Sequence, residues 1–366
     1  MNLVRRDLKN LAAYIAGKPI PETQRELGLE KVYKLASNEN PLGVSPKAIK
    51  AIQKALREIN RYPDSQSFYL KKRLAQEFKL SPNNFVLGNG SDELIDVIIK
   101  TFVENNETIL TANTTFLEYR IISKVNGRRI HEVPLKDFTY DLEKIRKRVN
   151  NKTKLIFIAN PNNPTGTYVN KKELINFIKS LPAHTITVLD EAYDTFIDVN
   201  DFPKSVEWIR NKNIIVLKTF SKAFGLAGLR IGFAVAKPEL TQYMEKVRQP
   251  FNLNSLAQAA SVSALDDRIF LSKTKKNNLT GKKYLYRELA KIPVTYIPSV
   301  ANFILVDTRL DCFLVFKQLL KKGIIVRDMK QYGLDTFIRV TIGTGEENKS
   351  FISALKEVIM NQKRIN

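Results

Sequence analysis

The chain has 366 residues, of which 43% are hydrophobic and 26% charged, and its formal net charge is +22. These proportions exclude a disordered or low-complexity chain, and the length allows two domains around a large core. No apolar run approaches the roughly 20 residues of a membrane-spanning helix, so we expect no membrane partner. The start of the chain lacks the long apolar core of a signal peptide. One cysteine and two histidines rule out an internal disulfide and argue against a metal site, which favours a cytoplasmic protein.

The excess of positive charge has three possible meanings, which are nucleic-acid binding, attraction of small anions, or a solvated basic surface. The basic residues stand in small groups such as Lys71–Arg73 and Arg146–Arg148. None of these groups alternates with aromatic residues as in a nucleic-acid-binding module. We therefore expect most of this charge to lie on a solvated surface, and we do not expect nucleic acid as the main partner.

In chain order, residues 1–45 are mixed and include a turn marked by Asn40-Pro41 and Gly43. Residues 46–80 have a helical pattern that Tyr62-Pro-Asp64 interrupts. From residue 85 onwards, short apolar strands alternate with helical runs such as 94–102 and 171–179. The strands are predicted at 85–87, 108–111, 155–159, 186–189, 214–217 and 232–236. This alternation is typical of an α/β domain with a mainly parallel sheet between helices.

Beyond this domain, residues 254–290 are predicted to form one long helix. A smaller α+β pattern follows from residue 292, with strands near 303–306 and 337–341. The sequence therefore predicts a large α/β domain followed by a smaller one.

Four short motifs follow predicted strands, at the edge where open α/β sheets bind their ligands. The first is Gly88-Asn-Gly-Ser-Asp-Glu93, a glycine-rich turn that leads into a predicted helix. Backbone N–H groups at a helix start attract phosphate, and Ser91 would add a hydroxyl. The alternative is a plain tight turn in which Ser91 caps the helix.

The second motif is Asn160-Pro-Asn-Asn-Pro-Thr-Gly166. Its prolines and glycine restrict the backbone, and Asn163 is kept out of the helical region because it precedes Pro164. We interpret the motif as a rigid turn that presents the Asn163 amide to a ligand. A rigid turn without a ligand is the alternative.

The third motif, Asp190-Glu-Ala-Tyr193, directly follows the apolar run 186–189. A carboxylate at the end of a buried strand is costly unless it meets a cation, such as a protonated ring nitrogen. Tyr193 could donate a hydrogen bond to the same ligand. The alternative is a surface acidic pair, which so apolar a strand makes less favourable.

The fourth motif is Lys218-Thr-Phe-Ser-Lys-Ala-Phe-Gly-Leu-Ala-Gly-Leu-Arg-Ile-Gly232. Lys222 could form a Schiff base, because a lysine enclosed in a packed site is usually either paired or chemically active. Thr219, Ser221 and Arg230 could hold a phosphate beside it. Taken alone, this stretch favours the alternative, a surface strand-to-loop transition with an exposed lysine.

The four motifs together supply a lysine for an imine, an acid for a pyridinium, an amide and a phenol for a phenolic oxygen, and hydroxyls with a guanidinium for a phosphate. Pyridoxal 5′-phosphate (PLP) needs these partners and little else from a protein. The sequence therefore predicts PLP as the cofactor.

On these residues the chain resembles the fold-type I PLP enzymes of the aminotransferase superfamily, and within them the histidinol-phosphate aminotransferases. The likeness covers nearly the whole chain. Ser221-Lys222 and Asn163–Gly166 are typical of the superfamily, whereas the blocks Ala36–Pro41 and Arg339–Thr344 are typical of the narrower family. The resemblance implies a mainly parallel sheet of the seven-stranded type in a large domain over 46–262. It also implies a smaller α+β domain made of 1–45 and 263–366.

The resemblance assigns three catalytic residues: Lys222 carries the cofactor and moves the proton, Asp190 pairs with the pyridinium nitrogen, and Tyr193 contacts the phenolic oxygen. Further cofactor contacts that it implies are Gly90, Ser91, Thr219, Ser221 and Arg230 at the phosphate, Asn163 at the phenolic oxygen, Phe116 stacked on the ring, and Asp92. No metal is implied.

The resemblance also assigns substrate contacts and a partner. Arg339 would bind the substrate carboxylate, with Asn163 beside it, and Tyr14 and Arg327 would bind the distal anionic group. Tyr62 would reach the cofactor phosphate of a neighbouring subunit, which implies a homodimer. The chain departs from the family at Thr114 and Ala13, where proline is commoner, and Phe116–Tyr119 also resembles the threonine-phosphate decarboxylases.

The leading hypothesis is therefore reversible transamination of histidinol phosphate with 2-oxoglutarate, a step of histidine biosynthesis. The alternatives within the superfamily are an aromatic amino acid aminotransferase and a threonine-phosphate decarboxylase. A basic nucleic-acid-binding protein with a degenerate enzyme fold is the alternative from another class.

Overall fold

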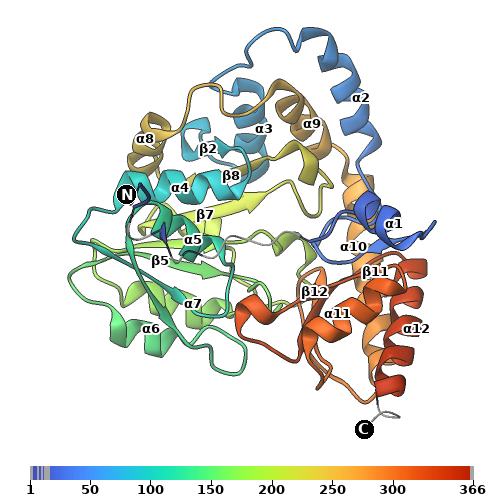
Figure 1. Ribbon diagram of the computed structural model, residues 1–366. Coiled ribbons are helices and arrows are strands. Elements are labelled where there is room, and N and C mark those ends of the chain that lie inside the picture. Colours follow the sequence, from blue (N-terminus) through green and yellow to red (C-terminus); the bar gives the residue numbers. More distant parts are fainter. Residues whose placement is uncertain (1–2, 6–7, 10, 12–16, 363–366) are drawn as a thin grey trace.

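The computed structural model describes residues 3–5, 8–9, 11 and 17–362 of the chain. Its largest unit is a seven-stranded sheet covered by helices (Figure 1). In spatial order the strands are β2 (Phe85–Gly88), β8 (Gly232–Ala236), β7 (Ile214–Thr219), β6 (Ile186–Asp190), β5 (Thr153–Ala159), β3 (Thr108–Ala112) and β4 (Arg129–Val133). Strand β8 runs antiparallel to both of its neighbours, and the other neighbouring pairs are parallel. The predicted mainly parallel α/β sheet is thus confirmed.

The interior strands were predictable because they are almost continuously apolar. All residues of β3, β6 and β8 are buried, as expected for strands covered on both faces. Strand β4 was not predicted. It lies at the sheet edge, and of its five residues only Val133 is buried, so its sequence lacks the apolar run that identified the others.

Helices surround the sheet: α2 (Pro46–Ala55), α3 (Phe68–Phe78), α4 (Ser91–Phe102), α5 (Glu118–Val125), α6 (Leu142–Arg148), α7 (Lys171–Lys179), α8 (Pro238–Val247) and α9 (Ser255–Leu265). Capping side chains determine where several of these helices begin. Helix α7 begins at Lys171 because the Asn170 side chain accepts the N–H of Glu173, which satisfies one of the free donors of the first turn. Helix α2 begins with Pro46 after Ser45, whose hydroxyl accepts the N–H of Ala48.

The prediction of one helix over 254–290 is wrong. The chain forms two helices there, α9 and α10 (Arg268–Leu289). Asp267 separates them, because its side chain accepts the N–H of Phe270 and caps the start of α10. The Asp267 carboxylate also accepts a hydrogen bond from Ser45 Oγ at 2.6 Å, and this contact between distant segments leaves no trace in the apolar periodicity.

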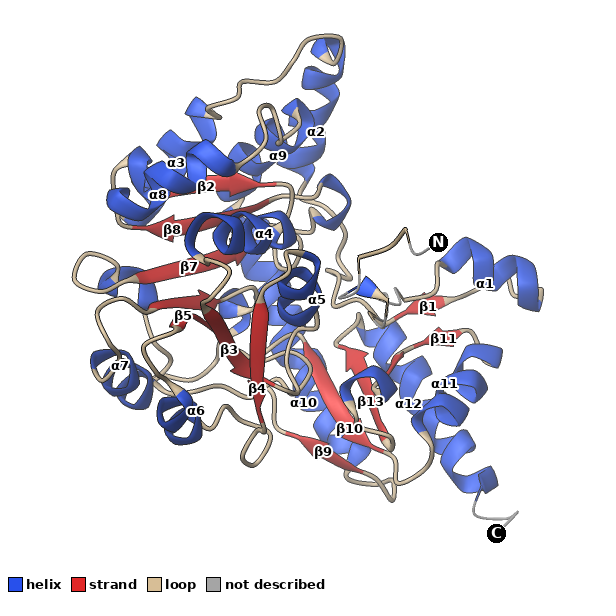
Figure 2. Ribbon diagram, turned by 60° about the vertical axis from the view of Figure 1, so that its left-hand side comes forward, coloured by secondary structure: helices blue, strands red, loops and turns tan. Residues whose placement is uncertain are grey.

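The second unit contains two small sheets and three further helices, α1 (Ile20–Leu27), α11 (Cys312–Lys321) and α12 (Gly345–Gln362). The larger sheet is antiparallel, with the order β12 (Arg327–Asp328), β13 (Phe337–Thr341), β10 (Phe303–Asp307) and β9 (Thr295–Ile297). In the smaller sheet, β1 (Tyr33–Lys34) pairs in parallel with β11 (Ile324–Ile325). The segment that carries α1 and β1 therefore lies beside the C-terminal helices, as the blue and red ribbons of Figure 1 and the strands of Figure 2 show.

Two separate hydrophobic clusters correspond to these units. One takes residues between Ala48 and Leu265, and the other combines Leu35 with residues between Leu285 and Ile359. These clusters support the predicted division into 46–262 and 1–45 with 263–366, which stays a prediction. None of the helices among the described residues is both long enough and apolar enough to cross a membrane.

Candidate active site

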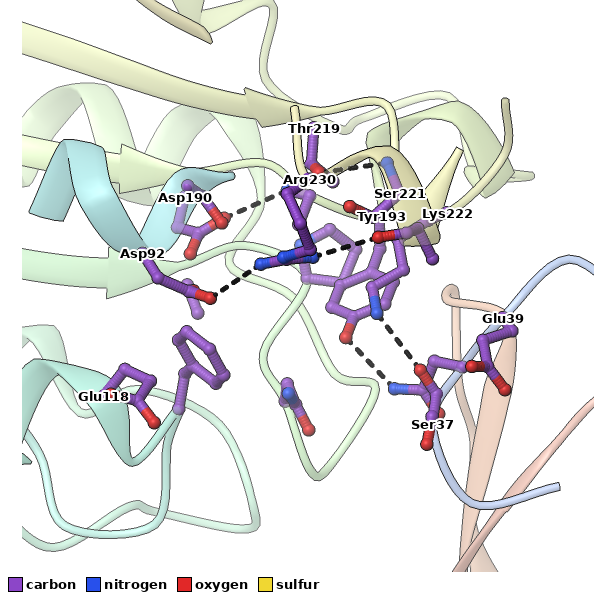
Figure 3. Close-up of a pocket in the computed structure, with 18 of the residues that line it drawn as sticks. Ser37, Glu39, Asp92, Glu118, Asp190, Tyr193, Thr219, Ser221, Lys222 and Arg230 are labelled. Carbon is purple, nitrogen blue, oxygen red and sulfur yellow. Dashed lines mark hydrogen bonds and ion pairs between the residues drawn. The ribbon is translucent and has the colours of Figure 1, made fainter. Parts of the chain in front are cut away.

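A cavity of about 420 Å³ is present at the carboxyl ends of β5, β6 and β7 (Figure 3). Both units contribute to its wall, since Arg339 of β13 and residues 37–39 face helix α4 and the large sheet across it. The predicted site residues that line the cavity are Ser91, Asp92, Phe116, Asn163, Asp190, Tyr193, Thr219, Ser221, Lys222, Arg230 and Arg339. The four sequence motifs thus meet at one place, as expected for the carboxyl edge of an α/β sheet.

Lys222 follows β7 and points its amine across the cavity, where Nζ donates a hydrogen bond to the carbonyl oxygen of Ser37 at 3.1 Å (Figure 3). The side chain touches the cavity, yet protein atoms surround the amine. Burial, together with the positive charge of Arg339, lowers the pKa of Lys222 to about 8. A substantial fraction of the amine is therefore neutral near physiological pH, as a nucleophile or a base requires.

The lowered pKa of Lys222 predicts a pH-dependent stability. Below about pH 8 the amine is protonated in the folded and the unfolded chain, and only the folded chain bears the cost of burying that charge. Between about pH 8 and the ordinary pKa of 10.5, the folded chain loses its proton first, so its stability rises with pH. We expect Lys222→Met to stabilise the cofactor-free protein by about 2 kcal/mol below pH 8 and by almost nothing above pH 10.5. Urea unfolding at several pH values measures this difference, and a gain independent of pH would contradict it.

Asp190 ends β6 and is buried, with both carboxylate oxygens held in place. Oδ2 accepts a hydrogen bond from the Tyr119 hydroxyl at 2.7 Å, and Oδ1 accepts the N–H of Ala192 at 3.1 Å. Burial raises the pKa of Asp190 to about 6, although these two hydrogen bonds act in the opposite direction. An enclosed carboxylate of this kind is suited to a cationic partner in the cavity, such as a protonated ring nitrogen.

The start of α4 forms an anion-binding corner. Gly90 has a φ of +85°, a backbone conformation that favours glycine, and a Cβ there would lie 2.7 Å from Nη2 of Arg230 and displace this guanidinium. Nη2 of Arg230 in turn contacts Oδ2 of Asp92 at 3.1 Å. Thr219 and Ser221 face this corner from the end of β7, and the Ser221 N–H donates to Thr219 Oγ1 at 3.1 Å. A helix start, two hydroxyls and a guanidinium are a donor set that fits a phosphate.

Arg339 lies on the opposite side of the cavity and is buried. Nη1 donates to Oδ1 of Asn163, and Nη2 donates to the carbonyl oxygen of Ala36 at 2.7 Å. Its Nε is enclosed and has no hydrogen-bond partner among the described residues. A buried guanidinium whose Nε–H has no acceptor is suited to binding an anionic group of a substrate. The cavity wall therefore contains the anion-binding corner at the start of α4, the Lys222 amine, the buried Asp190 and Arg339. This set fits PLP together with an anionic amine.

Comparison with known proteins agrees with this chemistry. Residues 30–355 match the family model of class I and II aminotransferases. The chain belongs to this aminotransferase family. Within it, the chain is 45% identical to a histidinol-phosphate aminotransferase of Caldicellulosiruptor saccharolyticus, over 98% of this chain and 100% of the relative. It is 44% identical to the enzyme of that name from Moorella thermoacetica, over 97% and 92% of the two chains.

A solved structure extends the likeness to the fold of this aminotransferase. The histidinol-phosphate aminotransferase of Sinorhizobium meliloti, solved in complex with PLP, superposes with a TM-score of 0.90 at 28% identity and covers 99% of each chain. The predicted family, the enzyme class and PLP as the family's cofactor are thereby confirmed.

Some predicted residues of this aminotransferase lie away from the cavity wall. Gly90 lies just behind it, against Arg230. Tyr62 is 82% exposed and stacks on Phe251, with ring centroids 4.8 Å apart. Arg327 is paired with Arg339 across β12 and β13, but lines a second cavity, of about 520 Å³. Tyr14 lies outside the described residues.

Two residues that the sequence analysis did not assign donate side-chain hydrogen bonds to predicted site groups. Tyr119 lies on α5, and its ring stacks on Phe157 with centroids 4.8 Å apart while its hydroxyl reaches Asp190. Its position three residues after Phe116 was the available signal, and the two rings pack edge to face with centroids 5.6 Å apart. Asn38 donates a hydrogen bond to the Tyr193 hydroxyl, and no pattern within its own motif indicates this.

Proposed function

We propose that this chain transfers the amino group of histidinol phosphate to 2-oxoglutarate, giving imidazole acetol phosphate and glutamate, and so serves histidine biosynthesis. The observation that carries the proposal is the meeting of the Lys222 amine, the Asp190 carboxylate and the phosphate-type corner around Gly90 in one cavity. The relatives named above support the choice of substrate, because the two chains of 44% and 45% identity are both histidinol-phosphate aminotransferases.

PLP, when bound, withdraws electrons from the amine-bearing carbon of a substrate and makes its C–H bond acidic. Lys222 is the residue that carries the cofactor and then moves this proton, since its pKa of about 8 lets it accept and return a proton near neutral pH. Ser37 holds the Lys222 amine in place through its carbonyl oxygen. Asp190 keeps the ring nitrogen protonated, and Tyr119 fixes the orientation of that carboxylate.

The remaining polar groups position the phosphate of the cofactor and the anionic groups of the substrate. Ser91, Thr219, Ser221 and Arg230 hold the phosphate of the cofactor, and Phe116 covers the ring. Arg339 binds the anionic group of the substrate, and Asn163 keeps its guanidinium in place through Oδ1. Arg327, on the neighbouring strand, and Tyr14 are proposed for the other anionic group. Because Arg327 and Arg339 are buried, small anions are the expected substrates.

A substrate panel tests this function. Purified protein supplied with PLP, glutamate and imidazole acetol phosphate is expected to form histidinol phosphate, and Lys222→Ala is the inactive control. Comparable turnover of phenylalanine or tyrosine without histidinol phosphate would support the aromatic aminotransferase instead. Release of carbon dioxide from phosphothreonine would support the decarboxylase.

The surface around Tyr62 supports a homodimer with shared sites. Several large apolar side chains are exposed on and between α2 and α3, which is unusual for a surface that stays in water. They are Leu56, Ile59, Tyr62, Phe68 and Tyr69. Tyr62 is not among the residues that line the cavity of its own chain, so a contact with a cofactor requires a second subunit.

Mixing two defective variants is expected to restore activity if Tyr62 acts across subunits. A heterodimer of Tyr62→Ala and Lys222→Ala contains one intact site, with Lys222 from the first subunit and Tyr62 from the second. Co-expression should therefore give about half of the wild-type rate per heterodimer. The matched control joins wild-type subunits to the double variant, which leaves no intact site. Equal rates in the two heterodimers, each purified away from the homodimers, would contradict the shared site.

The proposed location is the cytoplasm, where a biosynthetic aminotransferase meets its substrates. The single cysteine, Cys312, is buried and free, which is compatible with a reducing compartment. The charge of +22 is attributed to the solvated surface and to the attraction of anionic substrates.

A further inference from the structure

Asn38 is a buried residue at the junction of the two units, with an exposed fraction of 1%. It follows β1 and has a φ of +54°, a backbone conformation that glycine, asparagine and aspartate tolerate best. Its side-chain Nδ2 donates to the Tyr193 hydroxyl at 3.0 Å. Its N–H donates to Thr341 Oγ1 at 3.0 Å, and its carbonyl oxygen accepts from Asn302 Nδ2 at 3.0 Å. One residue thus links the large unit to the strand β13 and to the segment before β10.

The hydrogen bonds of Thr341 determine which way the Asn38 amide faces. Because the Thr341 hydroxyl accepts the N–H of Asn38, its own proton needs another acceptor, and Oδ1 of Asn38 lies 3.2 Å away. Oδ1 is thereby engaged, and the donor group Nδ2 faces Tyr193. An amide held at both ends in a buried site has one favourable orientation.

This orientation determines the direction of the Tyr193 hydrogen bond. The phenol oxygen accepts from Asn38, so the phenol proton must be donated elsewhere. Tyr193 lines the cavity, and among the described residues no other hydrogen bond of its hydroxyl is present. Burial raises the pKa of Tyr193 above its ordinary value, so the proton stays on the phenol. The hydroxyl is left with its proton available to a ligand in the cavity.

The two residues before Asn38 also contact Arg339 and Lys222. The carbonyl oxygen of Ala36 accepts from Arg339, and that of Ser37 accepts from Lys222. Thr341, which orients Asn38, stands two residues after Arg339 on β13, and side chains two apart lie on the same face of a strand. The orientation of the Tyr193 hydroxyl is therefore tied to the strand that carries the arginine.

We infer that Asn38 is a positioning residue that makes the Tyr193 hydroxyl a hydrogen-bond donor to the phenolic oxygen of PLP. This inference rests on the proposed cofactor site and adds to it the reason why asparagine stands at this position. Glycine or aspartate would allow the backbone conformation, but neither supplies a donor towards Tyr193 and an acceptor towards Thr341 at once.

Asn38→Asp tests the inference because it keeps the size and the backbone conformation and removes the donor. The carboxylate would accept the proton of Tyr193 and turn it away from the cavity. A donor to the phenolic oxygen stabilises the deprotonated chromophore. We therefore expect the midpoint of the visible-absorbance pH titration of the PLP-loaded, substrate-free protein to rise by about one pH unit or more.

A double-variant cycle separates the hydroxyl from the added charge. In a Tyr193→Phe background, Asn38→Asp changes only the charge, so its shift should be clearly smaller than in the wild-type background. Thr341→Ser, which keeps the hydroxyl, should titrate like the wild type, whereas Thr341→Val should shift the midpoint in the same direction as Asn38→Asp. Asn38→Gly keeps the backbone conformation without adding charge, and it replaces Asn38→Asp if the aspartate variant does not fold. The titration midpoint is then expected to rise by less than in Asn38→Asp.

The outcomes distinguish the inference from the function on which it rests. Wild-type protein that shows no visible absorbance with PLP would overturn the cofactor site and the inference together. Wild-type protein that titrates normally, with equal Asn38→Asp shifts in both backgrounds, would overturn only the role of Asn38. Equilibrium binding of PLP to the unloaded variants gives a second readout, and the inference expects weaker binding in Asn38→Asp but not in Thr341→Ser.

Discussion

Replacing Lys222 by alanine is expected to lower the rate of transamination by at least about 10⁴-fold. A positioned acid–base group alone contributes on the order of 10²–10⁴, and the covalent attachment of the cofactor adds to this. The amine is enclosed by the cavity, its pKa is lowered to about 8, and Ser37 fixes its position. No other lysine lines this cavity in the described part of the chain, so no neighbour can replace it. Single-turnover measurement of each half-reaction, with the absorbance of the loaded protein, gives the result.

Lys218 is the matched control for this substitution. It is also buried and precedes Lys222 by one short loop, but its Nζ is held between Glu191 at 2.8 Å and Asp194 at 2.5 Å, outside the cavity. Lys218→Arg keeps the charge and should leave the chemistry within a few-fold of the wild type, even if it lowers stability. A loss in Lys218→Arg as large as that in Lys222→Ala would contradict the assignment of Lys222.

Asp190→Asn is expected to lower the rate by about 10³-fold, or about 4 kcal/mol of transition-state stabilisation. The amide has the same shape as the carboxylate and can still accept a hydrogen bond from Tyr119, but it has no charge with which to keep a ring nitrogen protonated. The proton that makes the ring an electron sink is therefore lost, while cofactor binding is changed much less. The rate of each half-reaction and the dissociation constant of PLP separate the two effects.

Tyr119→Phe provides the comparison for Asp190. It removes the hydrogen bond to Oδ2 and leaves the ring stacked on Phe157, so the carboxylate keeps its charge but loses part of its orientation. We expect a loss of roughly tenfold, in line with one hydrogen bond to a charged group. An Asp190→Asn rate within threefold of the wild type would show that this carboxylate does not act on the cofactor.

The sequence predicted the features that depend on local pattern. The strands that end in Asp190 and Thr219 are short apolar runs. The motifs after them contain polar residues that strand formation and core packing do not explain. Because strand ends meet along one edge of a parallel sheet, their neighbourhood followed from the fold class alone. This is why the cofactor-type residues met in one cavity as expected.

The features that the sequence did not predict depend on contacts between distant segments. Asn38 and Tyr193 are 155 residues apart, and Asp267, which ends the predicted long helix, is held by Ser45. Edge strand β4 lacks an apolar run, and of its five residues only Val133 is buried. Arg327 and Arg339 were both expected to bind the substrate, and the strand register places them opposite each other. Their side chains nevertheless line different cavities, which the sequence does not show.

One measurement tests the central claim, that Lys222 carries PLP in this cavity. Protein loaded with PLP is reduced with borohydride, digested and analysed by mass spectrometry. The account predicts one pyridoxyl phosphate group per chain, on the peptide that contains Lys222, and none in protein first incubated with excess glutamate. A modification on another lysine, or none at all, would contradict the account.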